Sequence, residues 1–383
     1  MSPIVEKPTV RWEEAGSQRS ALWLSESRVT PPARVIAGDD SLKADLAYRY
    51  ACEGTAVVWR GDFENAKQLS SAVSRRFDHG RARRRAERPA APSDTFHRHR
   101  MEAAQRARAL GMILIELEPD YSVPLRRAPD IRAAVTEVYG PGRAPALVPL
   151  RDLLGMIGAR EWRRRGIFVE ALGARVFPHY GVFAPIRSEY VELVASARLP
   201  STESAFDIGT GTGVLAALLA RRGIARVIAT DIEPRAVACA EENLARLGFG
   251  GRTTVLRADL FPPEELAPRA SLIVCNPPWL PAKATTSLER AVYDQKSRML
   301  RGFLRALPRR LAPGGEAWLL MSDLAEHLGL RGPTALRDVF EEAGLRVKAK
   351  TDARPTHPRI EDRDDPLHEA RKAETISLWR LVP

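Results

Sequence analysis

Apolar residues follow two different periods along the second half of the chain. Apolar runs of about four to six residues alternate with longer stretches in which apolar residues recur every three or four positions. The short runs predict strands and the longer stretches predict amphipathic helices. Strands that alternate with helices form a mostly parallel sheet that is covered on both faces. We therefore expect strands at residues 204–208, 226–230, 254–257, 272–275, 317–321, 345–350 and 376–381, and helices at 188–197, 213–221, 234–247, 298–311 and 333–343.

The first half of the chain carries a less regular α/β pattern. Residues 1–18 are polar and we expect them to be loosely ordered, whereas the Arg-, Ala- and Pro-rich stretch at 80–93 predicts a basic linker. Residues 166–180 alternate around Gly173 as in a hairpin. This change of pattern predicts a smaller N-terminal α/β domain over residues 1–160 and a second domain over 161–383. The N-terminal strands are expected at 33–37, 55–59 and 112–116, and the helices at 42–51, 63–77, 96–110, 130–139 and 148–159.

Positive charge is concentrated in the first half. The chain of 383 residues has a net charge of +11, and residues 1–165 hold 29 Lys and Arg against 21 Asp and Glu. The excess is densest at 75–100, which suits phosphate contacts and equally suits a solvated basic segment. Three cysteines lie far apart without a CxxC pair, so we expect neither a disulfide framework nor a metal site. No apolar run reaches 18 residues and the N-terminus lacks a stretch of signal-peptide length, so we expect a cytoplasmic protein without a membrane partner.

A glycine-rich turn follows the first predicted strand of the second domain. Asp207 precedes it, and Gly209, Gly211 and Gly213 alternate with threonines, of which Thr210 is the first. The spacing is GxGxG and not the GxGxxG that seats a pyrophosphate on a helix N-terminus. A carboxylate at this point repels phosphate and attracts a ligand that carries ammonium and sulfonium groups. The turn therefore favours S-adenosylmethionine over NAD or ATP, and a turn without any ligand is the structural alternative.

Carboxylates also follow the second and third predicted strands of this domain. Asp231, with Ile232 beside it, lies where a carboxylate accepts hydrogen bonds from a ribose diol. Asp259, with Leu260 beside it, lies where a carboxylate accepts a hydrogen bond from an adenine amino group. The alternatives are a helix cap for Asp231 and a turn residue for Asp259. Together with the glycine-rich turn, these four residues make up the predicted cofactor site.

The fourth predicted strand of the domain ends in Asn276-Pro277-Pro278-Trp279. The lone pair of an amide or aromatic amine nitrogen is delocalised, and methyl transfer requires that it be freed. Two acceptors on the NH2 group, the Asn276 side-chain oxygen and the Pro277 carbonyl, favour that change and oppose the developing positive charge. Trp279 supplies a flat face for the planar group. We therefore assign Asn276, Pro277 and Trp279 to catalysis and include Asn276 in the cofactor site.

With these motifs in this order, residues 160–383 resemble class I S-adenosylmethionine-dependent methyltransferases of the NPP(Y/F/W) group. The resemblance implies a Rossmann-like, seven-stranded, mostly parallel sheet whose last strand is antiparallel. The run NPPWLP at 276–281 is similar to the NPPYIP of release-factor glutamine methyltransferases. The overall length and the α/β first half without motifs resemble two-domain ribosomal-RNA guanine-N2 methyltransferases. The signature of adenine-N6 methylases also accepts VCNPPW.

The sequence thus predicts an S-adenosylmethionine-dependent N-methyltransferase whose N-terminal domain recruits a macromolecular substrate. Protein glutamine and an RNA or DNA base all remain open as the methylated group, as does the oligomeric state. The alternative function is a non-catalytic module that binds S-adenosylmethionine or nucleic acid with a degenerate methyltransferase fold. An NAD-dependent oxidoreductase is disfavoured by the GxGxG spacing.

Overall fold

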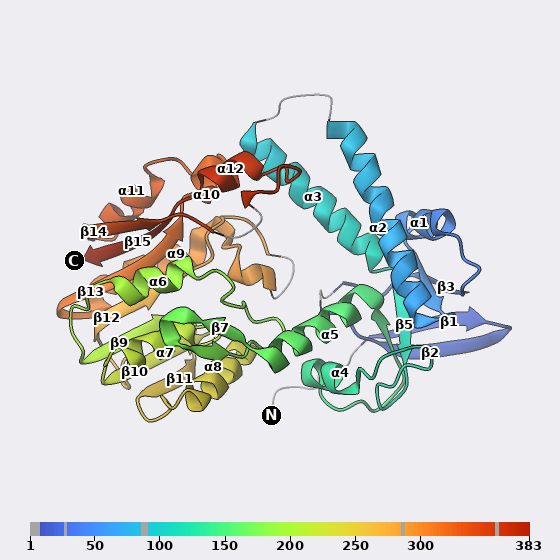
Figure 1. Ribbon diagram of the computed structural model, residues 1–383, viewed down its shortest axis with the longest axis horizontal. Helices are drawn as coiled ribbons and strands as arrows, with labels where there is room; N and C mark the ends of the chain where they lie inside the picture. The colour runs from blue at the N-terminus through green and yellow to red at the C-terminus, as the bar shows by residue number, and fades with distance from the viewer. Residues whose placement is uncertain (1–7, 27–28, 86–90, 285–287, 357–359) are drawn as a thin grey trace. The chain divides into compact units, whose positions relative to one another are not determined.

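The structure is a computed structural model that describes residues 8–26, 29–85, 91–284, 288–356 and 360–383. The chain divides into two compact units, and Figure 1 labels most of their elements. The N-terminal unit consists of Met1–Ala90 and His97–Glu161, and the C-terminal unit of Ala91–Phe96 and Trp162–Pro383. Each unit has a sheet and a hydrophobic core of its own.

Seven strands form the sheet of the C-terminal unit in the order β11-β10-β9-β12-β13-β15-β14. The strands from β11 to β13 run parallel, and β15 is antiparallel to both of its neighbours. The predicted fold class is therefore confirmed, including the antiparallel last strand. The strands are β9 (Ser204–Ile208), β10 (Arg226–Asp231), β11 (Thr253–Arg257), β12 (Ala270–Cys275), β13 (Leu311–Ser322), β14 (Arg346–Ala353) and β15 (Ile376–Val382), and a separate hairpin joins β7 (Ile167–Val169) to β8 (Ala174–Val176).

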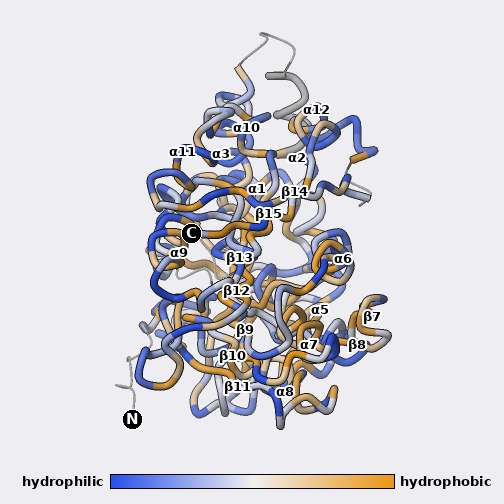
Figure 2. The backbone as a smooth tube through the Cα atoms, turned by 90° about the vertical axis from the view of Figure 1, so that its left-hand side faces the viewer, coloured by the Kyte–Doolittle hydropathy of each residue, from blue (hydrophilic) through white to orange (hydrophobic). Residues whose placement is uncertain are grey.

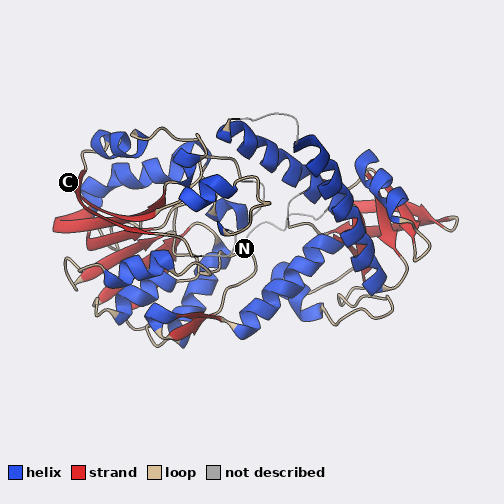
Figure 3. Cartoon of the chain, turned by 45° about the horizontal axis from the view of Figure 1, so that its top comes forward, coloured by secondary structure: helices blue, strands red, loops and turns tan. Residues whose placement is uncertain are grey.

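Helices cover both faces of this sheet because its strands are apolar on both sides (Figure 3). Along β12, Leu272 and Val274 join the core under α6, α7 and α8, whereas Ile273 and Cys275 join the core under α9 and α11. Figure 2 shows the strands side by side, with α6 and α7 on one side and α9 on the other. The helices are α6 (Glu189–Ser196), α7 (Val214–Arg221), α8 (Pro234–Arg246), α9 (Arg298–Arg310), α10 (Leu324–His327), α11 (Ala335–Glu342) and α12 (His368–Ala373).

The N-terminal unit is the smaller α/β domain that the sequence predicted. Its sheet has the order β1-β2-β6-β5-β4-β3 and mixes parallel with antiparallel pairs. The strands are β1 (Thr9–Glu14), β2 (Ser17–Trp23), β3 (Arg34–Gly38), β4 (Thr55–Trp59), β5 (Ile113–Leu117) and β6 (Ala146–Pro149), and the helices are α1 (Ala44–Glu53), α2 (Phe63–Arg85), α3 (Pro92–Leu110), α4 (Arg132–Tyr139) and α5 (Leu150–Arg165).

The expectation that residues 1–18 are loosely ordered is wrong for the described part of that segment. β1 pairs with β2 in an antiparallel hairpin, whereas residues 1–7 lie outside the described residues. Val10 and Trp12 alternate with polar residues and are buried to 3% and 4% exposure, so one face of the hairpin lies in the core. The turn is made by Ala15 and Gly16, which both have a positive φ.

The described part of the predicted linker at 80–93 is mostly helical. α2 continues to Arg85 and α3 begins at Pro92, while residues 86–90 lie outside the described residues. Arginine and alanine favour helix, which explains why an Arg-rich composition did not end α2. The sequence also missed β6, because its last two residues, Val148 and Pro149, were counted toward the helix that follows it.

Among the residues that the structure describes, no helix combines the length and apolar character needed to cross a bilayer. Within the same ranges, no group of three or more His, Cys, Asp or Glu side chains is arranged to hold a metal ion.

Candidate functional site

The glycine-rich turn joins β9 to α7 at the carboxyl edge of the seven-stranded sheet. Gly209, Gly211 and Gly213 all have a positive φ, at 73°, 56° and 80°, which L side chains rarely adopt. A Cβ on Gly213 would lie 3.1 Å from the Ala240 Cα, so this glycine lets α7 pack closely on α8. A Cβ on Gly211 would meet nothing within 4 Å. The backbone at Gly211 therefore faces open space, as it does where a ligand approaches the chain.

Asp207 lies beneath this turn and supports it. Its side chain is 1% exposed, and its Oδ2 accepts hydrogen bonds from the Thr210 hydroxyl at 2.6 Å and the Ala216 backbone N–H at 3.0 Å. Burial raises the pKa of Asp207 to about 6 against the effect of these hydrogen bonds, and the Asp231 carboxylate also raises it. A cation bound nearby favours the ionised form. The turn is thus stabilised by a carboxylate that itself favours a cationic ligand.

Strand register brings Asp231 and Asn276 to the two sides of this turn. Ile208 is paired with Thr230 of β10 on one side and with Cys275 of β12 on the other. Asp231 and Asn276 are the next residues along their chains and therefore flank Gly209. All of these residues stand at the carboxyl ends of parallel strands, where ligands bind in open α/β sheets.

The Asp231 carboxylate holds the glycine-rich turn from the β10 side. Its Oδ2 accepts a hydrogen bond from the Gly211 N–H at 3.0 Å, and its Oδ1 accepts one from the Glu233 N–H at 2.9 Å. Burial raises the pKa of Asp231, and these two backbone hydrogen bonds act in the opposite direction. Each carboxylate oxygen still has a second lone pair for a ligand. The neighbouring Ile232 is 51% exposed and presents an apolar surface at the same edge.

Asp259 and Leu260 follow β11, the edge strand of the sheet. The Asp259 carboxylate pairs with Arg298 at 2.9 Å, and its side chain is 60% exposed. Leu260 has a φ of 74°, and its carbonyl accepts a hydrogen bond from the Thr230 hydroxyl. The structure ties both residues to this edge by bonds within the chain, and a contact with adenine stays a prediction for each.

The indole of Trp279 is hydrogen-bonded to the side chain of Asn276. Its Nε1–H donates to the Asn276 Oδ1 at 3.0 Å and to the Leu320 carbonyl at 3.2 Å. Because an indole N–H meets only an acceptor, this contact fixes the orientation of the Asn276 amide. Asn276 and Trp279 are half-buried and Pro277 is buried. The sequence assigned Trp279 only a flat face, and the structure adds a positioning role for its N–H.

Sequence reasoning missed a second group of side chains beside Trp279. The Arg187 guanidinium carbon lies 5.5 Å from the centroid of the Trp279 ring, a cation–π arrangement. Arg187 also pairs at 3.1 Å with Glu374, which is fully buried and accepts a hydrogen bond from Ser322 at 2.7 Å. Arg187 and Glu374 are 187 positions apart in the sequence, so no local spacing could have indicated the pair.

Met299 is another residue of the site that the sequence did not indicate. A Cβ on Gly209 would lie 2.9 Å from the Met299 Cε, so this side chain rests on the glycine-rich turn. It is held there because Asp294 caps the start of α9, its Oδ1 accepting a hydrogen bond from the Met299 N–H at 3.0 Å. The segment after the NPPW motif thus returns to the predicted cofactor site.

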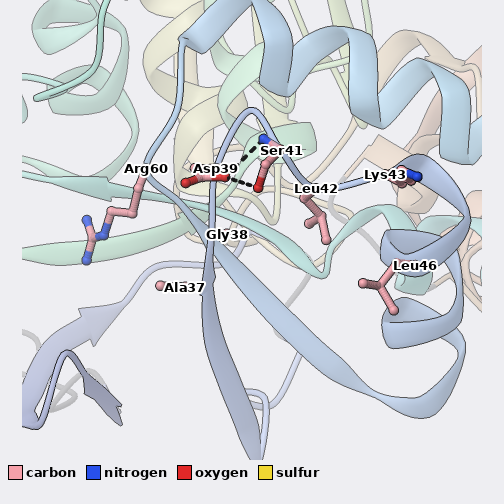
Figure 4. Close-up of a pocket in the computed structure, with 8 residues that line it drawn as sticks. All are labelled: Ala37, Gly38, Asp39, Ser41, Leu42, Lys43, Leu46 and Arg60. Atoms are coloured by element: carbon pink, nitrogen blue, oxygen red, sulfur yellow. Dashed lines mark hydrogen bonds between the residues drawn. The ribbon is translucent and has the colours of Figure 1, made fainter.

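A depression in the N-terminal unit lies where β3 and β4 end (Figure 4). The Asp39 Oδ1 accepts hydrogen bonds from the backbone N–H and the hydroxyl of Ser41. Arg60 pairs with Glu14 at 2.6 Å and with Glu116 at 2.5 Å. These polar groups are engaged with one another, and we assign no ligand to them. The depression is lined by Ala37, Gly38, Asp39, Ser41, Leu42, Lys43, Leu46 and Arg60.

Comparison with known proteins finds similarity in the C-terminal half of the chain. The family model of the methyltransferase small domain matches residues 174–351. The release factor glutamine methyltransferase of Cereibacter sphaeroides is 32% identical over 171 residues, which are 42% of this chain and 58% of that protein. The tRNA1(Val) (adenine(37)-N6)-methyltransferase of Shewanella amazonensis is 32% identical over 101 residues, which are 26% of this chain and 43% of that protein.

A third relative matches a shorter stretch. The ribosomal protein L11 methyltransferase of Pelotomaculum thermopropionicum is 44% identical over 71 residues, which are 18% of this chain and 22% of that protein. The chain thus spans between about a fifth and three fifths of the length of these three relatives. The C-terminal half is thus similar to the methyltransferase small domain family over residues 174–351, and the resemblance to such methyltransferases that the sequence predicted is confirmed.

Proposed function

We propose that this chain is an S-adenosylmethionine-dependent methyltransferase that methylates a planar nitrogen of a protein glutamine or of an RNA or DNA base. One observation carries the proposal. The open backbone at Gly211, the Asp231 carboxylate and the Asn276 amide meet at adjacent strand ends within a methyltransferase small domain. An open backbone beside carboxylates suits a cationic nucleoside, and an amide oxygen next to it suits an NH2 group.

The residues at these strand ends fit S-adenosylmethionine, which when bound supplies an electrophilic methyl group on a sulfonium. We assign its binding to the turn and the carboxylates around it. Asp231 accepts hydrogen bonds from the ribose hydroxyls, Ile232 covers the adenine, and Asp207 keeps a negative charge beneath the turn. The full proposed set is Asp207, Gly209, Thr210, Gly211, Gly213, Asp231, Ile232, Asp259, Leu260 and Asn276.

The catalytic role falls to the NPPW motif. The Asn276 Oδ1 and the Pro277 carbonyl accept hydrogen bonds from the substrate NH2 group and so free the nitrogen lone pair. Because both acceptors are held in place before the reaction, they oppose the developing positive charge without reorganisation. The extra proton leaves after transfer, so no general base has to act first. Trp279 holds the Asn276 amide in the orientation that this role requires.

We assign recruitment of the macromolecular substrate to the N-terminal half. Residues 1–165 carry most of the excess positive charge of the chain, which attracts polyanions and acidic surfaces over a distance. The three relatives reported above are named for a release factor, a tRNA and ribosomal protein L11, and they therefore support a macromolecular substrate here. The proposal includes a cytoplasmic location, supported by three free cysteines.

The test of the substrate uses S-adenosylmethionine with a labelled methyl group. The full chain is incubated with separated protein, RNA and DNA fractions of a cell extract, and the labelled product is digested to amino acids or nucleosides. We expect label on glutamine, adenine or guanine nitrogen in one fraction. Saturable binding of S-adenosylmethionine without label in any fraction would favour the alternative, a non-catalytic binding module. Preferential binding of NADH would refute both.

The cofactor assignment is tested by Asp231→Asn. The change keeps the shape of the side chain and removes its charge, so we expect the affinity for S-adenosylmethionine to fall at least about tenfold, since one hydrogen bond to a charged group contributes about 1.5–3 kcal/mol. Asp338→Asn is the matched control, because Asp338 accepts a hydrogen bond from Thr334 on α11, outside the proposed site. Equal affinity in both variants, measured by calorimetry on folded protein, contradicts the assignment.

A further inference from the structure

The first turn of α3 is built into the C-terminal unit although it comes from the first half of the sequence. Residues 91–96 belong to the C-terminal unit, whereas the rest of α3 belongs to the N-terminal unit. Phe96 ends this segment and is 1% exposed. Its ring lies edge-on to the Tyr293 ring, with centroids 6.4 Å apart. The buried cluster around it consists of Leu280, Leu324, Ala325, Leu328 and Leu367.

Leu280 and Tyr293, which both lie next to Phe96, close the base of the loop that follows the NPPW motif. Leu280 comes directly after Trp279, and it forms a β-bridge with Tyr293. The Leu280 N–H donates to the Val292 carbonyl at 3.1 Å, and the Asp294 N–H donates to the Leu280 carbonyl at 2.9 Å. Phe96 therefore packs on the base of this loop, where residue 280 pairs with residues 292–294.

The other residues of the cluster connect the Phe96 ring to two further segments near Trp279. Leu324 and Leu328 belong to α10 and to the residue after it, beyond the end of β13. Arg331 follows within a few residues, and its guanidinium donates to the Trp279 carbonyl at 2.9 Å. Leu367 comes from the connection between β14 and β15, which also carries Glu374, the partner of Arg187. The base of the loop, α10 and the segment of Leu367 thus all pack against the Phe96 ring.

We infer that Phe96 is a positioning residue for the acceptor site, which it acts on through the base of the 280–294 loop and through α10. The first half of the chain therefore contributes to the alignment of Trp279 and Asn276, in addition to any role in recruitment. The inference rests on the proposed function, from which the catalytic role of the aligned residues is taken. The packing itself is tested without reference to that function.

The test compares Phe96→Ala with Phe96→Leu in the full chain. Hydrogen exchange is measured at the Leu280 and Asp294 amides, and at the Gly209 and Thr210 amides, which are both bonded to the Thr230 carbonyl. In Phe96→Ala we expect exchange at Leu280 and Asp294 to accelerate about tenfold or more, as for local opening after loss of a buried aromatic contact. Exchange at Gly209 and Thr210 and the affinity for S-adenosylmethionine stay unchanged.

Turnover supplies the second readout of the same variants. Methyl transfer into the extract fraction that the wild-type chain labels is expected to fall in Phe96→Ala through kcat, and Phe96→Leu is expected to restore most of it. Phe63→Ala is the matched control, because Phe63 is equally buried at 1% exposure but lies in the N-terminal unit. We expect it to leave exchange at Leu280 and Asp294 unchanged.

Two results overturn the inference. The first is wild-type exchange at Leu280 and Asp294 in folded Phe96→Ala, and the second is equal acceleration throughout the C-terminal unit. If Phe96→Ala does not fold, Phe96→Leu carries the comparison, with a smaller acceleration confined to the same two amides expected and wild-type exchange there overturning it. Failure of the wild-type chain to bind S-adenosylmethionine would refute the proposed function and leave the exchange comparison valid.

Discussion

Replacement of Trp279 by phenylalanine separates the two roles of this residue. Phenylalanine retains a flat apolar face but has no N–H, so the hydrogen bonds to the Asn276 Oδ1 at 3.0 Å and the Leu320 carbonyl at 3.2 Å are both lost. If Trp279 only stacks on the substrate, Trp279→Phe retains activity. If its N–H orients the Asn276 amide, Trp279→Phe lowers turnover even though the aromatic face remains.

The size of the effect follows from the bond that is lost. A net hydrogen bond contributes about 0.5–1.5 kcal/mol, and about 1.4 kcal/mol corresponds to a factor of ten. We therefore expect kcat of Trp279→Phe to fall by roughly twofold to tenfold. Asn276→Ala removes the acceptor itself and is expected to lower kcat by about 10²–10³. Trp279→Phe should not alter the affinity for S-adenosylmethionine, because its indole N–H is proposed to act on the Asn276 amide and not on the cofactor; Asn276 also belongs to the proposed cofactor set, so kcat is the readout for Asn276→Ala.

A double-mutant cycle decides whether the two residues act as one unit. If Trp279 acts through Asn276, the double variant Asn276→Ala with Trp279→Phe is no slower than Asn276→Ala alone. The assay is transfer of labelled methyl into the extract fraction that the wild-type chain modifies, with thermal unfolding as a check on folding. Wild-type turnover in Trp279→Phe, or losses that multiply in the double variant, would refute the positioning role.

Two further predictions concern the cofactor side of the site. Burial raises the pKa of Asp207 from 3.8 to about 6, and a cationic ligand favours its ionised form. The affinity for S-adenosylmethionine should therefore fall as the pH drops below about 6 and should level off above about 7. Calorimetry across the pH range measures this profile, which Asp207→Asn should flatten. The same shift means that the ligand-free protein loses stability from this group as the pH rises from 3.8 to about 6, because the folded state retains the proton longer than the unfolded state. Gly211→Ala places a Cβ in the open space at a φ of 56°, so it should lower the affinity for S-adenosylmethionine about tenfold and destabilise the fold by about 1–2 kcal/mol. The control is Gly251→Ala, which meets nothing within 4 Å at an ordinary φ and should change neither quantity. Equal effects of the two alanines on binding would show that Gly211 does not face the ligand.

The parts of the site that follow strand ends could be predicted from local sequence. A strand, a turn and a helix fit within the ten residues around Gly209, and the spacing of glycines there reflects the backbone conformation directly. Asp231 and Asn276 each follow an apolar run, and parallel strands bring the ends of such runs together. The contact of Trp279 with Leu320 spans 41 positions and that of Arg187 with Glu374 spans 187. Contacts of that span depend on the register of packed elements, which one sequence does not display.

The errors in the first half of the chain have a common cause, which is that composition was given more weight than position. Residues 9–23 hold many polar side chains, yet the alternation of Val10 and Trp12 with polar neighbours is the pattern of a strand with one buried face. The stretch after Phe77 is rich in arginine, yet α2 continues through it to Arg85. Phe96 was counted as the start of a helix in the first domain, whereas its ring belongs to the core of the second unit.

Under the proposed function, the choice of substrate is made outside the four strand ends that carry the proposed cofactor-binding and catalytic residues. An amide oxygen and a proline carbonyl accept an NH2 group in the same way whether it belongs to glutamine or to a base. Under the proposed function we expect specificity to depend on residues near Trp279, which include Arg187 with its partner Glu374, Leu280 at the base of the loop that follows, and Leu367. Phe96, which comes from the first half of the sequence, packs on Leu280 at the base of that loop and on Leu367. If Phe96 positions the acceptor site as we infer, deletion of residues 1–160 removes this contact together with the proposed recruitment domain, so a loss of transfer in that variant has two causes, which Phe96→Ala in the full chain separates.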